Sequence, residues 1–170
     1  MVTNHFSDII IFMVEIHKTV AKLYESNKED LELFECLDEF SDTQNFCDHY
    51  GFDIEDSCNA ILIKAKKPGE FYAIFCVLGA NRLDVNHKAK EAMGAKRVSF
   101  ASREEAELVT EQIYGGISPL GLPENIKVFI DKNVMEREKL FIGAGNRVSK
   151  FFLSPEILIK LSNAEVLDLT

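Results

Sequence analysis

The chain has 170 residues, of which 46% are hydrophobic and 28% charged, a composition typical of one globular domain with its own core. Its net charge of −9 argues against general nucleic-acid binding, and DNA is not an expected partner. The apolar run over residues 9–14 is too short to span a bilayer, and no secretory pattern precedes it. We therefore expect no membrane partner, and cysteines expected to be reduced favour the cytoplasm.

The N-terminal part predicts an amphipathic helix, because apolar residues recur at helical spacing over residues 4–25. We expect residues 1–30 to form a helical extension packed on the core, and residues 31–170 to form the main domain. Residues 31–37 alternate as in a strand. Residues 43–50 predict a short helix that Ser41 or Asp42 caps and Gly51 closes.

The central part contains the clearest strands, residues 60–65 and 71–78, which Pro68-Gly69 joins in a hairpin. The pattern Ser-x-x-Glu at Ser102 and Glu105 predicts the capped start of a helix. The other elements expected here are a helix over 86–93 and a strand over 98–100.

The C-terminal part predicts strands over 127–130, 140–142 and 148–153, then a helix that starts with Pro155. An edge strand over 166–169 ends the chain. Strands and helices thus alternate irregularly, with at least one hairpin. This order indicates an α/β protein in which helices pack on a mixed sheet.

The most informative motif is the loop Gly115-Gly116-Ile117-Ser118-Pro119-Leu120-Gly121. Adjacent glycines expose backbone N–H groups, and a proline stiffens the loop, so it is suited to hold a carbonyl or an oxyanion. A serine nucleophile is disfavoured, because Leu120 stands where a nucleophile elbow needs glycine. Ser118 is better interpreted as a hydrogen-bonding residue of the site.

Other candidates keep two interpretations. The turn Gly143-Ala144-Gly145 fails the dinucleotide pattern; it either lets a ligand approach the backbone or simply turns the chain. Asp131 at a strand end either caps the next turn or binds a substrate amine. The four histidines and four cysteines lack the spacing of a zinc site, and we expect buried, reduced thiols and no metal or cofactor.

Charge is unevenly distributed along the chain. Residues 1–58 hold 3 basic and 14 acidic side chains, whereas residues 64–103 hold 9 basic and 3 acidic ones. The basic segment is either an ordinary solvated surface or a contact for a nucleic-acid backbone. The acidic segment could instead contact a protein partner.

Several motifs together resemble the YbaK/EbsC family, also called the ProX or prolyl-tRNA-synthetase insertion-domain type. The segments that carry the resemblance are Arg82-Leu83-Asp84, Gly94-Ala95-Lys96-Arg97, Ser102-Arg103-Glu104-Glu105-Ala106, Gly115 to Gly121, Val128-Phe129-Ile130-Asp131, Ile142-Gly143-Ala144-Gly145 and Leu153-Ser154-Pro155. The resemblance implies a mixed, partly closed sheet surrounded by helices. It also implies a trans-editing hydrolase that cuts the ester between a small, wrong amino acid and the 3′ end of tRNA.

The resemblance further implies a site without a metal, in which a hydroxyl or thiol of the substrate assists the attacking water. It assigns the ester carbonyl to backbone groups of Gly115, Gly116 and Ser118, and the pocket wall to Ile117, Pro119, Asp131 and the turn 143–145. Apart from the resemblance, an aminoacyl-tRNA synthetase is the expected protein partner of the acidic N-terminal part. The candidates for tRNA contact are Lys64, Lys66, Lys88, Lys96 and Arg97.

One position departs from the family pattern. Counting back from Arg82 places the usual lysine of the family at Asn59. An amide can still orient an aminoacyl group or a ribose, but it stabilises developing negative charge less than an ammonium does. The sequence therefore predicts a deacylase with weakened or altered catalysis, or alternatively a non-catalytic module that binds a charged tRNA end, an amino acid or a nucleotide.

Overall fold

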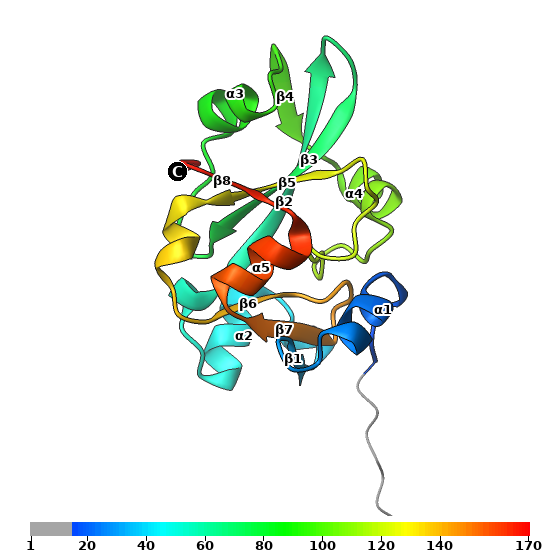
Figure 1. The fold of residues 1–170 in the computed structure, drawn as a ribbon, viewed down its shortest axis with the longest axis vertical. Coiled ribbons are helices and arrows are strands. Elements are labelled where there is room, and N and C mark those ends of the chain that lie inside the picture. Colours follow the sequence, from blue (N-terminus) through cyan, green and yellow to red (C-terminus); the bar gives the residue numbers. More distant parts are fainter. Residues whose placement is uncertain (1–14) are drawn as a thin grey trace, which may run out of the picture.

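The computed structural model describes residues 15–170 of the chain. The helix predicted over residues 4–25 is present as α1 (Lys18–Ser26); the prediction is wrong for residues 15–17, which are not helical because His17 caps the helix, and residues 1–14 lie outside the described part. Val20 of α1 is fully buried, and the ring of Tyr24 stacks on Phe151 with 5.7 Å between centroids. α1 therefore packs on the main body through its apolar face (Figure 1).

The larger sheet has the strand order β4-β2-β3-β5-β8. Its strands are β2 (Cys58–Lys67), β3 (Phe71–Leu78), β4 (Arg97–Phe100), β5 (Lys127–Asp131) and β8 (Glu165–Leu167). β2 pairs antiparallel with β3 and β4, whereas β5 pairs parallel with β3 and β8. The predicted hairpin is present, and its tip projects beyond the rest of the molecule beside β4 (Figure 1).

The smaller sheet has the order β1-β7-β6 and is antiparallel throughout. Its strands are β1 (Glu32–Glu35), β6 (Leu140–Gly143) and β7 (Ser149–Leu153). A single β-bridge between Ser57 and Phe141 joins it to the start of β2. The predicted mixed α/β class is confirmed, with the strands divided between two sheets that meet at this bridge.

The helices begin where the sequence places their caps. Asp42 caps α2 (Thr43–Tyr50), since its carboxylate accepts from the amides of Gln44 and Asn45. The predicted capping box opens α4 (Arg103–Thr110). The remaining helical segments are 3-10 turns over Asp38–Phe40, Ile54–Asp56 and Lys132–Glu136, a π-helical turn over Val85–Ala89 followed by α3 (Lys90–Ala92), and α5 (Pro155–Ser162).

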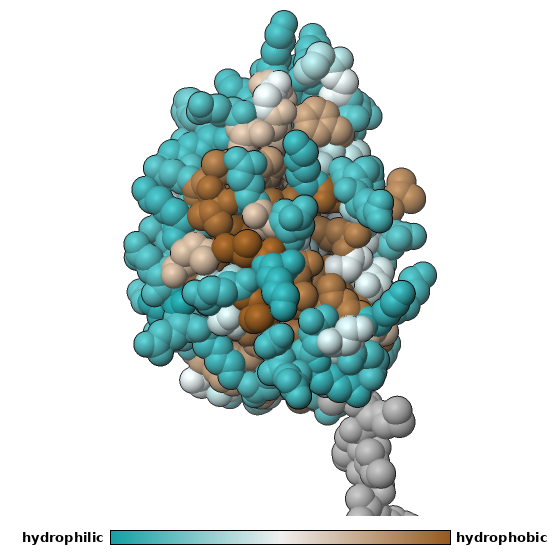
Figure 2. Space-filling model, in the orientation of Figure 1, coloured by the Kyte–Doolittle hydropathy of each residue, from teal (hydrophilic) through white to brown (hydrophobic). Residues whose placement is uncertain are grey.

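The main hydrophobic core links the two sheets. Ile74 and Ile130 of the larger sheet belong to the same buried cluster as Ile142 and Phe151 of the smaller one. Figure 2 shows that hydrophobic residues also gather on the face that carries α5, with hydrophilic residues around them. Because apolar burial is the main stabilising term in folding, the junction of the sheets is a firm base for a site.

Candidate functional site

The glycine-proline loop follows α4 and is braced from inside by the buried side chain of Gln112. Its Oε1 accepts from the Ser118 amide at 2.6 Å, and its Nε2 donates to the Leu120 carbonyl at 2.9 Å. The Ser118 hydroxyl accepts from the Leu120 amide at 3.1 Å. One buried amide thus bridges two points of the loop and fixes its course.

The two glycine motifs predicted from the sequence meet in the structure. The amide of Gly145 donates to the Gly116 carbonyl at 2.7 Å, and the amide of Ile113 donates to the Gly145 carbonyl at 2.9 Å. A Cβ atom at Gly116 would overlap the carbonyl of Asn146, and one at Gly143 would lie 2.5 Å from the Ile117 carbonyl oxygen. Both glycines are therefore required because backbone approaches backbone.

A cavity of about 530 Å³ opens where this pair of loops faces β2. Five of the residues predicted for the site line it: Asn59, Gly115, Gly116, Ile117 and Gly143. These residues come from segments far apart in the sequence, and the bridge between the two sheets brings them together. The cavity is therefore the candidate functional site.

Asn59 projects from β2 at this cavity. Its Oδ1 accepts from two hydroxyls, those of Thr43 and Ser57, each at 3.0 Å. Its Nδ2 has no hydrogen-bond partner among residues 15–170. The amide is thus held by its oxygen, and its two N–H groups remain to donate to a ligand.

The backbone donors of the loop differ in availability. The amide of Gly116 donates to the Ile113 carbonyl at 3.0 Å, and that of Ser118 is taken by Gln112. In the described part of the chain no acceptor is found for the amides of Gly115 and Ile117, both of which line the cavity. These two N–H groups, rather than those of Gly116 and Ser118, are the backbone donors left for a carbonyl oxygen.

Lys150 is a cavity residue that the sequence analysis missed. It lies on β7 and is 7% exposed, with Nζ donating to the Ser41 carbonyl at 3.0 Å and 4.9 Å from the centroid of the Phe46 ring. Burial lowers the pKa of its ammonium. The sequence did contain a signal for Lys150, because this lysine directly precedes the apolar run Phe-Phe-Leu. In the structure all five residues of that strand are buried.

Ser41, Thr43 and Arg147 also line the cavity and were not predicted. The guanidinium of Arg147 binds the 3-10 turn before α2, with Nε donating to Asp38 Oδ1 at 2.6 Å. It also lies against Gly115, where a Cβ atom would overlap Nη1. Arg147 therefore ties the glycine loop to the segment that leads into α2.

Other predicted site residues lie away from this cavity. Ser118, Ala144 and Gly145 are buried behind the loops, and Pro119 lines a neighbouring groove beside α1 and α5. In Gly145 a Cβ atom would meet the His17 ring at 3.0 Å. These residues shape and support the two loops rather than the cavity surface.

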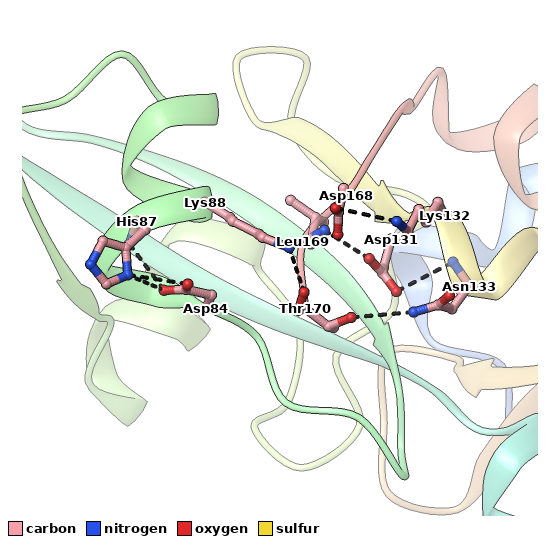
Figure 3. Close-up of polar contacts among 9 residues, drawn as sticks. All are labelled: Asp84, His87, Lys88, Asp131, Lys132, Asn133, Asp168, Leu169 and Thr170. Carbon is pink, nitrogen blue, oxygen red and sulfur yellow. Dashed lines mark hydrogen bonds and ion pairs between the residues drawn. The ribbon is translucent and has the colours of Figure 1, made fainter.

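Asp131 caps the turn after β5, which is one of its two predicted roles. It is fully buried, and its carboxylate accepts from the amides of Leu169 at 2.8 Å and Asn133 at 3.3 Å (Figure 3). It is not among the residues that line the cavity with Asn59. The geometry therefore favours a structural cap over contact with a substrate.

The basic candidates for tRNA contact fall into two groups. Lys64 pairs with Glu105 at 2.7 Å and Glu70 at 3.1 Å, and Lys88 pairs with Asp168 at 2.7 Å (Figure 3). The second group consists of exposed residues on β2 and at β4, namely Lys66, Lys96 and Arg97. No ion pair with these three is found among residues 15–170, so their charges remain available.

Two aromatic side chains lie at the cavity and are open to solvent. Phe100 at the end of β4 is 62% exposed, and Tyr114 before the glycine loop is 48% exposed. Aromatic rings in such positions can stack with unpaired bases.

Between residues 15 and 170, no cluster of three or more His, Cys, Asp or Glu side chains could hold a metal ion. All four cysteines are buried and unpaired, as predicted. Over the same residues, no helix combines the length and the apolar character that crossing a bilayer requires.

The chain is similar to known proteins over most of its length. The model of the aminoacyl-tRNA editing domain matches residues 38–161. EbsC of Enterococcus faecalis, named as a proposed Cys-tRNA(Pro)/Cys-tRNA(Cys) deacylase, is 25% identical over 158 residues, which cover 93% of this chain and 90% of that protein. Proline–tRNA ligase of Streptococcus pneumoniae (strain Hungary19A-6) is 39% identical over 57 residues, or 34% of this chain and 9% of the ligase.

The fold is also found in solved structures. A crystal structure described as a proposed trans-editing enzyme for prolyl tRNA synthetase superposes with a TM-score of 0.77 at 20% identity. The match covers 92% of this chain and 99% of that one. It shows that the two-sheet arrangement is shared across nearly the whole of that chain.

Proposed function

The chain belongs to the aminoacyl-tRNA editing domain family, of the YbaK/EbsC type, and on this premise we propose that it acts in trans as a deacylase. In this proposal it hydrolyses the ester between a small, wrong amino acid and the 3′ end of a tRNA. The observation that carries the proposal is one cavity lined by Asn59 and by both glycine loops. All of these residues lie within the matched range 38–161.

The cavity offers donors for an ester rather than a built-in nucleophile. In the proposed complex, the amides of Gly115 and Ile117 donate to the ester carbonyl, and Asn59 Nδ2 orients the aminoacyl group or the terminal ribose. Water is the nucleophile, and a hydroxyl or thiol of the substrate helps to activate it. Preorganised donors of this kind each contribute about 10²–10³ in rate.

The tRNA end is proposed to enter past β4. Lys66, Lys96 and Arg97 would meet the phosphates of the acceptor stem, and Phe100 and Tyr114 would stack with the terminal bases. Because phosphate contacts depend on salt, tRNA affinity should fall steeply between low and physiological salt. A synthetase that holds the same tRNA is a further partner under this proposal.

A panel of mischarged tRNAs tests the function. The purified chain is incubated with tRNA(Pro) and tRNA(Cys) carrying labelled alanine, cysteine, serine or threonine, and release of the label is followed. We expect release from at least one small amino acid, with poor discrimination between side chains that differ by one methylene. A Gly69→Ala variant is the control, and it should release amino acids as the wild type does, since a Cβ atom at position 69 meets nothing within 4 Å.

The alternative function is a binding module that holds the charged tRNA end, an amino acid or a nucleotide without hydrolysis. Asn59 favours it, because a neutral amide stabilises an oxyanion less than a lysine would. Retention of charged tRNA in a binding assay, without release of any of the four amino acids, would replace the deacylase by this module.

A further inference from the structure

Two polar groups at the cavity lack the partners that buried groups normally have. The Lys150 ammonium donates to one protein oxygen among the described residues, the Ser41 carbonyl, and otherwise faces the Phe46 ring. The hydroxyl of Ser41 is buried and has no hydrogen-bond partner within residues 15–170. Both residues line the cavity.

Burying the Lys150 ammonium at this position costs free energy of folding. It has three protons to donate, and no carboxylate in the described part of the chain lies within ion-pair distance of it. Replacing buried charges with apolar side chains of similar volume is often neutral or stabilising. Stability alone therefore does not explain a lysine at position 150, whereas a ligand oxygen that carries negative charge does.

Lys150 and Asn59 reach the cavity from different sheets and contact the same short segment. Lys150 on β7 binds the Ser41 carbonyl, and Asn59 on β2 accepts from the Thr43 hydroxyl. A cation at position 150 thus serves the same end of the cavity as a side chain at position 59. The positive charge that Asn59 does not supply from β2 is supplied by Lys150 from β7.

We propose that Lys150 is the cationic catalytic residue of this cavity, with its ammonium on the carbonyl oxygen of the aminoacyl ester. The ammonium contacts the backbone carbonyl of Ser41, and in this proposal the hydroxyl of the same residue donates a further hydrogen bond to the aminoacyl group. This inference rests on the proposed deacylase function and names the residue that supplies its positive charge.

The chemical step is a hydrolysis in which Lys150 keeps its proton. Water attacks the ester carbon, and the electron pair of the C=O bond moves to the carbonyl oxygen, where the ammonium stabilises the negative charge. The charge returns as the bond to the ribose oxygen breaks. One proton of the water goes to that ribose oxygen, and the other is released to solvent as the amino acid leaves as a carboxylate.

A side-chain atom of the amino acid is the competing ligand for the ammonium. Negative charge develops on the ester oxygen whichever amino acid is attached, whereas a side-chain contact exists only for amino acids with a hydroxyl or thiol. The two cases therefore differ in their dependence on the amino acid.

The first arm of the test compares Lys150→Met with the wild type on alanyl-, seryl- and cysteinyl-tRNA, with Lys132→Met as the matched control on an exposed lysine. We expect Lys150→Met to lower kcat by about 10²–10³ on all three substrates. The melting temperature should stay at or above the wild-type value, because the lost group is a buried charge. KM should not fall below the wild-type value. A loss confined to seryl- and cysteinyl-tRNA would assign Lys150 to the side chain and overturn the proposal.

The second arm returns the charge from the other sheet. In the double variant Asn59→Lys/Lys150→Met, the ammonium enters the cavity from β2, and we expect at least a tenfold recovery of kcat over Lys150→Met. The proposal needs both results: wild-type kcat in Lys150→Met overturns it, and so does the absence of recovery in the double variant. If the wild type itself releases no amino acid, the deacylase function fails first, which separates the two failures.

Discussion

Two groups of polar residues in this protein differ in whether their hydrogen bonding is satisfied within the protein. In the C-terminal cluster around Asp131, each carboxylate oxygen of Asp131 accepts a backbone amide, and Asp168 pairs with both Lys88 and Lys132 (Figure 3). At the cavity, the Ser41 hydroxyl and Asn59 Nδ2 have no partner within residues 15–170, and Lys150 has one carbonyl.

The difference separates a structural role from a ligand-binding one. Buried polar groups are normally satisfied, and an unsatisfied group costs about 1–3 kcal/mol. The Asp131 cluster meets this rule and holds the C-terminal residues against the end of β5. At the cavity the buried Ser41 hydroxyl breaks this rule, and Asn59 Nδ2 and Lys150 Nζ keep donors that no protein acceptor fills, which is the arrangement expected where a substrate completes the hydrogen bonding.

The largest effect on stability is expected from Gly116→Ala. Its Cβ atom would overlap the Asn146 carbonyl, which is backbone and cannot yield without moving the turn after β6. We expect a loss of about 3 kcal/mol in the free energy of unfolding, together with loss of deacylation. Urea unfolding measures it, and Gly69→Ala should stay within about 0.5 kcal/mol of wild type. A stable Gly116→Ala protein would show that the two loops are not held in contact.

Asp131→Asn tests the satisfied cluster. The new NH₂ group would face one of the two amides that the carboxylate now accepts, so one N–H group is left unpaired in a buried site. We expect a loss of about 2 kcal/mol in unfolding free energy, and we expect stability rather than kcat to carry the effect. Asp168→Asn, on an exposed carboxylate, is the control and should change stability far less. A fall in kcat with unchanged stability would show that Asp131 acts in the functional site instead.

Ser41→Ala tests the unsatisfied group at the cavity, and we expect it to raise the free energy of unfolding where the two previous variants lower it. Removing a buried hydroxyl without a partner should raise the free energy of unfolding by about 1 kcal/mol, while kcat/KM falls about tenfold if the hydroxyl donates to the substrate. Ser154→Ala is the matched control, because it removes the cap of α5 and should lower stability by about 1 kcal/mol. Destabilisation by Ser41→Ala would mean that the hydroxyl is already satisfied.

The smallest effect is a pH dependence at Glu105, which lies outside both groups. The hydrogen bond from Lys64 is the main reason that the pKa of Glu105 falls from 4.5 to about 2. A depressed carboxyl pKa adds stability that is present above pH 4.5 and is lost as the pH falls from 4.5 towards 2. Glu105→Gln should therefore lower stability at pH 6 and make it less dependent on pH in that window, as acid titration of unfolding can show. Parallel curves for the two proteins would contradict the assignment.

The sequence by itself determined most of the helices and strands and the presence of the glycine-rich loop. The Ser102–Glu105 box, Asp42 with Gly51, and the Pro155 helix start were readable because capping needs particular side chains at fixed, short separations. The glycine-rich loop was readable for the same reason, since bare backbone has few other uses. Its contact with the turn 143–145 could not be deduced, because that contact joins segments far apart in the chain.

Only the tertiary structure decided what stands at the cavity. Lys150 and Ser41 are separated by more than a hundred positions, and they meet because the smaller sheet packs against the start of β2. In the folded chain the Asp131 carboxylate accepts from the Leu169 amide, away from the cavity. The amides of Gly116 and Ser118 donate to other groups of the protein and are not available to a ligand. Local propensity fixes short-range hydrogen bonds, whereas burial and unmet hydrogen bonding arise only when distant segments pack, and the chemistry of this site depends on the latter.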